Sequence, residues 1–562
     1  MKKHHFTYVV LTILLSSLVS CEDMLTEDPD SFYKKEQYFT SESKAEMSIY
    51  SIYESIASKS HYGGNEMAPP ASDDTYYING VASDNTRRDI AHYNLTSANT
   101  WIQEIWMYKY QGIDRANYAI DGIQNMNGYS ENKNLQRLVA EARFLRAFLS
   151  FDLIKYWGDV PFKTTYSADY ESAFGGRINR ETIYDEIIKD LNFAKETLDW
   201  ANAETSPERA TQGAARALLM RVYLQRAGYS LQQDGTLTRP DDAKRNEYFK
   251  AVIEEWKIFK AHGYHDFYSG GYTELFKSFS GQILNSQESL LEVALHHVSG
   301  SLQGNGLWGT YNGPEVDAPG ILPTEADKFM GRANAFFRVV PEWKDFFEEN
   351  DTRRDVMVCI YMYKWDAKDY KHKKVENKSN KWYPGKWRRE WMPIGFSNPN
   401  STNVNYCVLR YADVVLMAAE AYNETGDTPQ AWILLNSVRT RSGATPITNA
   451  NYKELLKAPK VYDLPFIQDG DDQGKFRTAL YWERGFELAF EGQRKYDLIR
   501  WGILKEALEA FGSKSVLNKP ISKSDAYPAY KNFTSGKHEL FPIPLKEMQS
   551  NPKLEGKNNP GY

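Results

Sequence analysis

Apolar residues recur at helical spacing along most of the chain. In residues 134–157, five apolar side chains follow one another at three- or four-residue steps on one helical face: Leu138, Ala142, Leu145, Leu149 and Leu153. The same spacing predicts further helices at about 44–58, 101–123, 181–199, 208–227 and 243–261. The pattern therefore indicates a mostly helical protein.

Two more helices are separated by clear stop and start signals. The segment LRYADVVLMAAEAYNETG (409–426) ends at Gly426, and Asp427 with Pro429 opens a second helix that runs to Gly443. Two antiparallel helices within about 34 residues fit a tetratricopeptide-like unit. Two further helix pairs could form such units: 134–157 with 181–199, and 208–227 with 243–261.

Loop-rich insertions interrupt this helical scaffold, which we place at about 44–262 and 409–505. Residues 60–100 and 265–405 form the insertions, and the second is dense in Gly, Pro, Asn and aromatic residues. Loops held on a rigid scaffold often carry function. We therefore expect the insertions to form the ligand face.

The N-terminus has the features of a lipoprotein leader. Lys2 and Lys3 precede a 13-residue apolar run, too short for a permanent membrane span. The next residues, Leu18-Val19-Ser20-Cys21, resemble a bacterial lipobox. We predict that residues 1–20 are removed, that Cys21 is lipidated and that 21–562 form a single domain. An ordinary secretory signal with a chance cysteine is the alternative.

Charge and cysteine content exclude several classes of function. Lys and Arg number 68 against 74 acidic residues, a net charge of −6 that argues against general nucleic-acid binding. Three cysteines exclude a disulfide scaffold or a multi-cysteine zinc site. Cys359 and Cys407 are expected to be buried free thiols, although they could pair. Neither the histidines His262, His265, His296 and His297 nor any glycine-rich motif indicates a metal or nucleotide, so we expect no cofactor and no metal.

Several segments, taken in order, resemble the SusD/RagB family of outer-membrane nutrient-binding lipoproteins. They are the lipobox, TWIQEIWMYKYQGIDRAN (100–117), AEARFLRAFLSFDLIKYWGDVPF (140–162), ARALLMRVYLQRAG (215–228), LRYADVVLMAAEAYNETGD (409–427), ERGFELAFEGQRKYDLIRWG (483–502) and the chain end at 541–562. The resemblance implies four tetratricopeptide-like units with a variable loop-rich face. It also implies an outer-membrane location at the cell surface, no enzymatic activity and a SusC-like TonB-dependent transporter as partner.

The segment 483–502 carries a regular array of charges. Glu483, Glu487 and Glu491 recur every four residues, with Arg484, Arg494 and Arg500 available to neutralise them. Carboxylates at this spacing repel one another unless they are paired. We interpret the array as a buried Arg–Glu network that fixes the last helices; a carboxylate site for acid–base work or metal is the alternative.

Two loop segments combine aromatic rings with polar groups, as sugar binding requires. The first segment is SDDTYYINGVASDN (72–85), which is followed shortly by Trp101, and the second is GNGLWGTYNGPE (304–315). The candidate ligand residues are Asp73, Asp74, Tyr76, Tyr77, Trp101, Trp308 and Tyr311. Resemblance to the family's ligand loops supports Asp73, Asp74 and Trp101; the loop chemistry alone suggests Trp308 and Tyr311. Trp106, inside the helix, is expected in the core.

These observations predict a cell-surface lipoprotein that captures an oligosaccharide and delivers it to a SusC-like transporter. Two alternatives stay open: an oligopeptide-binding protein of a RagB-like importer, and a surface-anchored glycoside hydrolase. The basic, tryptophan-rich segment 361–391 could bind single-stranded nucleic acid or an anionic polysaccharide; a solvated, partly packed hairpin or loop is the simpler interpretation.

Overall fold

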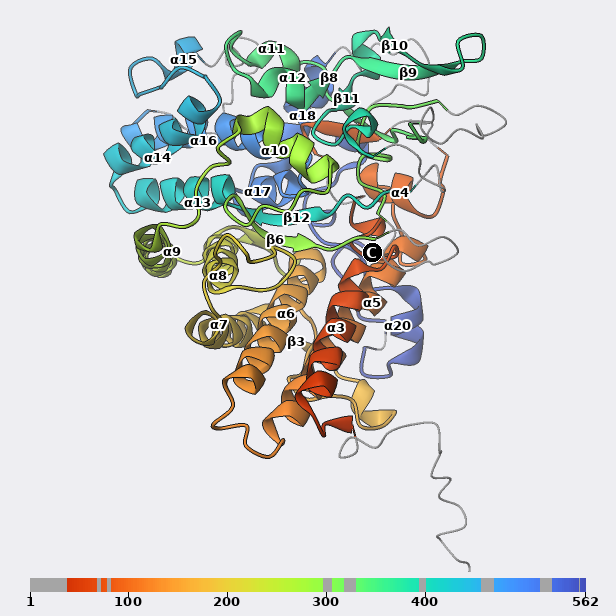
Figure 1. Cartoon of the computed structure of the whole chain (residues 1–562), viewed down its shortest axis with the longest axis vertical. Helices are drawn as coiled ribbons and strands as arrows, with labels where there is room; N and C mark the ends of the chain where they lie inside the picture. The colour runs from red at the N-terminus through yellow and green to blue at the C-terminus, as the bar shows by residue number, and fades with distance from the viewer. Residues whose placement is uncertain are drawn as a thin grey trace, which may run out of the picture.

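Long capped helices form the body of the molecule in the computed structural model, which describes residues 38–67, 72–77, 82–296, 306–317, 330–393, 401–455, 470–515, 528–554 and 556–562 (Figure 1). Helix α6 (Lys133–Trp157) shows why they form. The Asn132 side chain accepts hydrogen bonds from the first free backbone N–H groups, and the chain leaves the helix at Gly158 with φ 70°. Most of the residues between these ends are buried.

The other helices include the whole predicted set. Their bounds are α3 Glu42–Ala57, α4 Arg87–Ala91, α5 Thr100–Gln124, α7 Arg180–Thr197, α8 Gln212–Ala227, α9 Asp242–His262, α10 Gly271–Ser280, α11 Trp343–Phe346, α12 Arg353–Met357, α13 Tyr411–Glu424, α14 Thr428–Arg441, α15 Tyr452–Leu455, α16 Asp472–Leu488, α17 Arg494–Arg500, α18 Leu504–Lys514, α19 Ala529–Asn532 and α20 Leu545–Ser550. The mostly helical fold class is confirmed. None of the described helices is both long and apolar enough to cross a membrane.

Within the described ranges, the short strands join in antiparallel pairs. The pairs are β1 (Thr75–Tyr77) with β7 (Phe337–Val339), β2 (Val160–Pro161) with β3 (Arg177–Ile178), β4 (Ser230–Leu231) with β5 (Leu237–Thr238), β6 (Ser289–Val293) with β12 (Tyr406–Arg410), β8 (Val358–Cys359) with β11 (Tyr383–Pro384), and β9 (Tyr361–Asp366) with β10 (Lys371–Glu376). Pairs β1–β7 and β6–β12 each join segments far apart in the sequence. Pair β1–β7 joins the two insertions to each other, and pair β6–β12 joins the second insertion to the strand that leads into α13 of the scaffold.

The scaffold helices pack in chain order. Helices α5, α6, α7, α8 and α9 each contact the next, α13 then contacts α9 and α14, and α16 lies against α13 and α14 (Figure 1). The three helix pairs that the spacing predicts, α6–α7, α8–α9 and α13–α14, are therefore in contact. This stacking is what a tetratricopeptide-like scaffold requires; the number of repeats stays a prediction.

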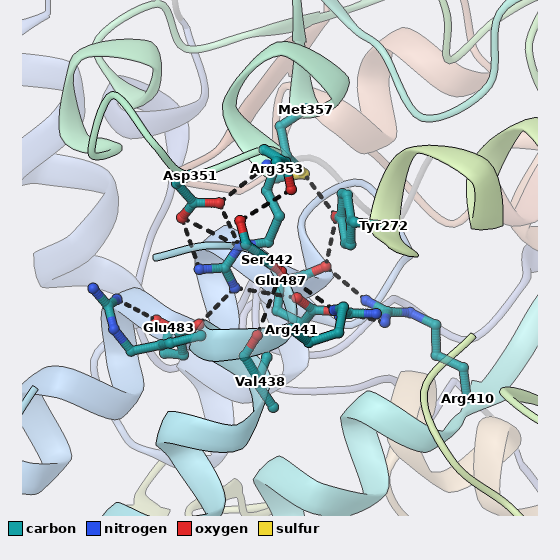
Figure 2. Close-up of polar contacts among 12 residues, drawn as sticks. Tyr272, Asp351, Arg353, Met357, Arg410, Val438, Arg441, Ser442, Glu483 and Glu487 are labelled. Atoms are coloured by element: carbon teal, nitrogen blue, oxygen red, sulfur yellow. Dashed lines mark hydrogen bonds and ion pairs between the residues drawn. The ribbon is translucent and has the colours of Figure 1, made fainter. Parts of the chain in front are cut away.

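A buried network of charges lies where α16 and α17 meet the large insertion. Glu487 accepts hydrogen bonds from Arg353 at 3.1 Å, from Arg410 at 2.5 Å and from Arg441, and all four side chains are buried (Figure 2). Glu483 pairs with Arg353 at 2.5 Å and with Arg439 at 2.8 Å. Because each carboxylate has at least two guanidinium partners, their negative charges are compensated inside the protein.

The third glutamate extends this network toward the insertion. Glu491 pairs with Arg410 at 2.7 Å and with Lys386, which follows β11. The structural interpretation of the 483–502 array is thus confirmed, but the predicted partners are wrong. Arg484, Arg494 and Arg500 pair instead with Asp413, Asp497, Asp73 and Glu420. Successive helical residues point about 100° apart, so Arg484 lies on another side of α16 from the glutamates.

The structure also shows where two of the cysteines and two of the histidines lie. Cys359 and Cys407 are both free and buried. His262 is the last residue of α9, where it stacks on Trp200 at 4.1 Å, and His265 lies in the turn that follows. Two helix starts differ from the prediction: residues 409–410 belong to β12, so α13 begins at Tyr411, and the helix expected from about 208 begins at Gln212.

Replacing Glu487 by Gln should lower the free energy of unfolding by about 3–5 kcal/mol at pH 7, because three guanidinium groups lose their shared carboxylate. Burial opposes ionisation of Glu487, but Arg441, Arg410 and Arg353 outweigh it and hold its pKa well below the ordinary value. A depressed pKa contributes stability above the unfolded-state pKa, and this contribution is lost as the pH falls. Urea unfolding should therefore show a difference from wild type that shrinks between pH 7 and pH 3.

The control for this prediction is Glu247→Gln. Glu247 lies on the surface of α9 and, among the described residues, pairs only with the exposed Lys244, so its replacement should change stability by less than about 1 kcal/mol. Equal stability of the Glu487→Gln and Glu247→Gln proteins would contradict a stabilising role for the network.

Candidate ligand-binding site

Four aromatic rings surround one guanidinium group at the start of α4. The Arg87 guanidinium carbon lies 4.3 Å from the ring centroid of Phe336, 5.6 Å from that of Tyr311, 5.7 Å from that of Trp101 and 6.0 Å from that of Tyr77. We call these five residues the Arg87 cage. Arg87, Trp101, Tyr311 and Phe336 are half-buried and reach the surface, whereas Tyr77 is buried behind them.

Helix caps fix the positions of Arg87 and Trp101. The Asn99 side chain accepts hydrogen bonds from the N–H groups of Trp101 and Ile102 at 3.1 and 3.2 Å, which starts α5. The same side chain donates to the carbonyl of Thr86, the residue before α4, at 2.9 Å. One asparagine therefore holds the starts of both helices together.

The other rings reach the cage through the insertions. Strands β1 and β7 pair so that Tyr77 faces Phe337, and the neighbouring Phe336 stacks on Tyr77 at 5.7 Å with the planes 15° apart. Tyr311 accepts a backbone hydrogen bond from Phe337 at 3.1 Å and meets Phe336 edge-on at 4.7 Å. Three chain segments that are distant in the sequence thus meet at one surface.

The chemistry of the cage is that of a stacking surface with a hydrogen-bond donor at its centre. Arg87 Nε donates to the Tyr77 hydroxyl at 2.6 Å, which orients the guanidinium. Burial raises the pKa of Tyr77 to about 12, although Arg87 opposes that rise, so the phenol stays neutral. Among the described residues, none accepts a hydrogen bond from Nη1 or Nη2 of Arg87. Those groups can donate to a hydroxyl or carboxylate of a ligand that lies on the rings.

The predicted acidic ligand residues are in the protein interior. Asp73 pairs with Arg494 through two contacts of 2.9 Å and accepts from the Tyr481 hydroxyl at 2.6 Å. Asp74 accepts hydrogen bonds from Ser72 and Thr75, and burial together with Asp73 raises its pKa. Both carboxylates are fully buried. The prediction that they contact a ligand is therefore wrong: they attach the insertion to the scaffold.

Three predicted aromatic residues are also buried. Tyr76 donates its hydroxyl to the Asn380 carbonyl at 2.7 Å. Trp308 packs against Trp387 and Tyr406, with ring centroids at 5.0 and 4.7 Å. For Tyr76 and Trp308 the ligand prediction is wrong, because neither ring is accessible. Tyr77 is inaccessible as well, and it supports the cage from behind through its bond to Arg87 and its stacking on Phe336.

Trp101 and Tyr311 are the two predicted residues that reach a common surface, and their ligand contact stays a prediction. Sequence reasoning missed Arg87 and Phe336. The adjacent arginines in NTRRDIAH (85–92) were a signal for Arg87, since guanidinium groups bind sugar hydroxyls. Phe336 had no comparable signal. Trp106, expected in the core, is buried and packs edge-on against Trp157 at 5.1 Å.

The remaining candidates are placed as follows. Residues 361–376 form the β9–β10 hairpin, so a hairpin is present in the first half of the segment 361–391; a binding role for this segment stays a prediction. Within the described part of the chain, no cluster of three or more His, Cys, Asp or Glu side chains could hold a metal ion. Cys21 and the leader 1–20 lie outside the described residues.

Two family models match the chain at its two ends. The model described as "SusD family" matches residues 341–562, and the model described as "Starch-binding associating with outer membrane" matches residues 23–224. The chain is a SusD-like protein. The first match contains the charged array and the last helices, and the second contains Arg87 and Trp101.

Whole-length relatives agree with this assignment. The SusD-like protein P25 of Formosa agariphila is 26% identical over 99% of both chains. A solved SusD homolog from Bacteroides thetaiotaomicron is 26% identical, with a TM-score of 0.77 over 94% of this chain and 98% of its own. The surface glycan-binding protein A of Bacteroides fluxus shares the fold, with 20% identity and a TM-score of 0.67 over 93% of this chain and all of its own.

Truncation of two tryptophans should separate the core from the cage of this SusD-like protein. Trp308→Ala should lower the free energy of unfolding by about 3–5 kcal/mol, because it leaves a cavity among packed rings. Trp101→Ala removes a half-exposed ring at a helix start and should cost clearly less. Chemical unfolding of both variants tests this, and equal losses would place Trp101 in the core.

Proposed function

We propose that this SusD-like protein is a cell-surface lipoprotein that binds an oligosaccharide at the Arg87 cage and passes it to a SusC-like TonB-dependent transporter. The observation that carries the proposal is the convergence of Trp101, Tyr311 and Phe336 on the guanidinium of Arg87. Sugar rings offer flat C–H faces to such aromatic rings, and their hydroxyls accept hydrogen bonds from a guanidinium.

The cage favours binding over hydrolysis. A glycosidase needs two carboxyl groups on either side of the scissile bond. Asp84, the acidic residue just before α4, accepts hydrogen bonds from the backbone N–H groups of Thr86 and Arg88 at 2.9 and 3.1 Å. Its carboxylate is therefore used to start the helix. A binding protein without catalysis accounts for this arrangement more simply.

Delivery to a transporter rests on the family and on the N-terminus rather than on the cage. One matching family is described as associating with the outer membrane, and the lipobox at Cys21 would supply the anchor. A lipid anchor is compatible with the described helices, none of which spans a membrane. Oligopeptide capture is the competing outcome of the binding experiment below.

Single replacements in the cage should weaken glycan binding without unfolding the protein. An aromatic contact is worth about 0.5–1.5 kcal/mol beyond buried area, so Trp101→Ala and Tyr311→Ala should each weaken binding several-fold to about tenfold. Arg87→Gln should act similarly by removing a charged donor. The measurement is calorimetric titration with a glycan selected from an array, accompanied by thermal melting.

Tyr170→Ala is the matched control for these variants. Tyr170 is 76% exposed and lies far along the chain from the cage, so its loss should leave binding unchanged. Trp106→Ala should instead lower the melting temperature, because that ring is buried. Normal glycan binding by the three cage variants would place the site elsewhere, and binding of peptides but no glycan would support the oligopeptide alternative.

Replacing Cys21 by Ala should release the protein from the membrane, because the thiol that accepts the lipid is gone. Fractionation of cells and labelling with radioactive palmitate measure this directly. Cys359→Ala is the control, since that thiol is buried in the folded domain and should leave fractionation unchanged. A Cys21→Ala protein that still carries label and stays with membranes contradicts the lipobox.

A further inference from the structure

A second cavity lies between the scaffold helices, away from the Arg87 cage. It has a volume of about 460 Å³ and is lined by the ends of α8, α13 and α17, by α9 and α16, and by the chain after β5. In Figure 1, helices α8, α9, α13 and α16 are on the left and α4 is on the right. The cavity shares no residue with the cage, and its size falls within the range of about 300–1,000 Å³ usual for ligand sites.

The floor of the cavity is a rigid charged pair. Arg500 donates to both oxygens of Glu420, at 2.5 and 2.8 Å, and the indole N–H of Trp501 donates to the same carboxylate at 2.9 Å. Arg500 and Glu420 are both more than nine-tenths buried. Arg500 and Trp501 come from the end of the charged array 483–502, so this end of the motif lines an open cavity while its glutamates are enclosed.

Two glycines set one wall of the cavity. A Cβ atom on Gly228 would lie 2.5 Å from the carbonyl oxygen of Arg500, and one on Gly502 would lie 2.7 Å from the Tyr229 ring. Gly502 also has φ 74°, which favours glycine. The turn at Tyr229 can therefore pack tightly on α17, with its N–H donating to the Arg500 carbonyl at 2.7 Å.

Two arginines that line the cavity keep hydrogen-bond donors that no described residue uses. Arg239 is exposed, lies 5.1 Å from the Tyr229 ring centroid and has no carboxylate partner among the described residues. Arg477 uses Nε and Nη2 to bind Glu424, at 2.5 and 3.0 Å, and its Nη1 makes no hydrogen bond within that described set. Both arginines line the cavity.

A third arginine of the lining, Arg245, has its charge compensated by two carboxylates. Arg245 donates to the exposed Asp242 at 3.1 Å and lies 3.5 Å from Glu424. The surplus donors are therefore those of Arg239 and Arg477. An anionic group that enters would meet guanidinium groups before it reached the buried Glu420, and Tyr229 and Trp501 would offer ring surface beside it.

We propose that this cavity is a second saccharide site that takes an acidic sugar. A uronic acid combines the two features that the lining accommodates. Its carboxylate pairs with the free donors of Arg239 and Arg477, and its ring lies against Tyr229 and Trp501. Neutral sugars lack the first interaction and bind this cavity less well. The site is independent of the Arg87 cage and of what the cage binds.

Titration of a variant with a disabled cage tests this proposal. The full-length Arg87→Gln/Trp101→Ala protein is titrated with a galacturonic acid trimer, with a galactose trimer and with inorganic sulfate. One equivalent of the acidic trimer should bind, and the neutral trimer should bind at least about tenfold more weakly. Adding Arg239→Gln should weaken the acidic trimer by about tenfold, while adding Lys250→Gln, an equal charge change on the exposed side of α9, should leave it unchanged.

Three results would overturn the proposal. The acidic trimer does not bind the cage-disabled protein; Arg239→Gln and Lys250→Gln bind it equally well; or inorganic sulfate competes as strongly per anion as the sugar, which would mean that the cavity recognises charge alone. The proposed function is tested by a different experiment. That experiment titrates the array-selected glycan into the single cage variants, in which this cavity is intact, so either proposal can fail without the other.

Discussion

Buried pairs of guanidinium and carboxylate groups are the interaction on which the binding face depends. Asp73 of the first insertion pairs with Arg494 of α17, 421 positions away in the sequence, and Arg353 of the second insertion pairs with Glu483 and Glu487 of α16. Leaving one member of such a pair without its partner is far more costly than replacing both by apolar groups. The loop-rich insertions are thus fixed to the helices at buried points, and their outer residues can stay at the surface without losing their positions.

The abundance of aromatic residues serves the core and the cage together. Trp308 and Tyr311 are three positions apart, yet Trp308 packs among buried rings and Tyr311 reaches Arg87. Both residues belong to one local turn, in which the N–H of Tyr311 donates to the carbonyl of Leu307 at 3.0 Å. Aromatic side chains in one short loop therefore supply stability at position 308 and a contact surface at position 311.

Helices could be predicted closely because their signal is local. Apolar spacing and caps place α5, α6 and α9 within about two residues of their observed bounds. The site could be predicted only in part, because exposure in a loop depends on distant partners. Nothing near Asp73 in the sequence indicates Arg494, so an acidic loop residue was mistaken for a ligand contact. Phe336 becomes a site residue only because β7 pairs with β1, a contact between segments some 260 residues apart.

The way the cage is held also bears on how a captured ligand could be released. Arg87 is oriented by the Tyr77 hydroxyl, and Asn99 joins the starts of α4 and α5, so binding would need little ordering of the protein. Pre-organisation of this kind raises affinity for a given set of contacts. The contacts themselves are few, however: three half-exposed rings and one guanidinium. The proposed delivery to a transporter requires that the ligand be released, and an open site with few contacts is compatible with release. A deep enclosing pocket would hold the ligand longer and oppose the transfer.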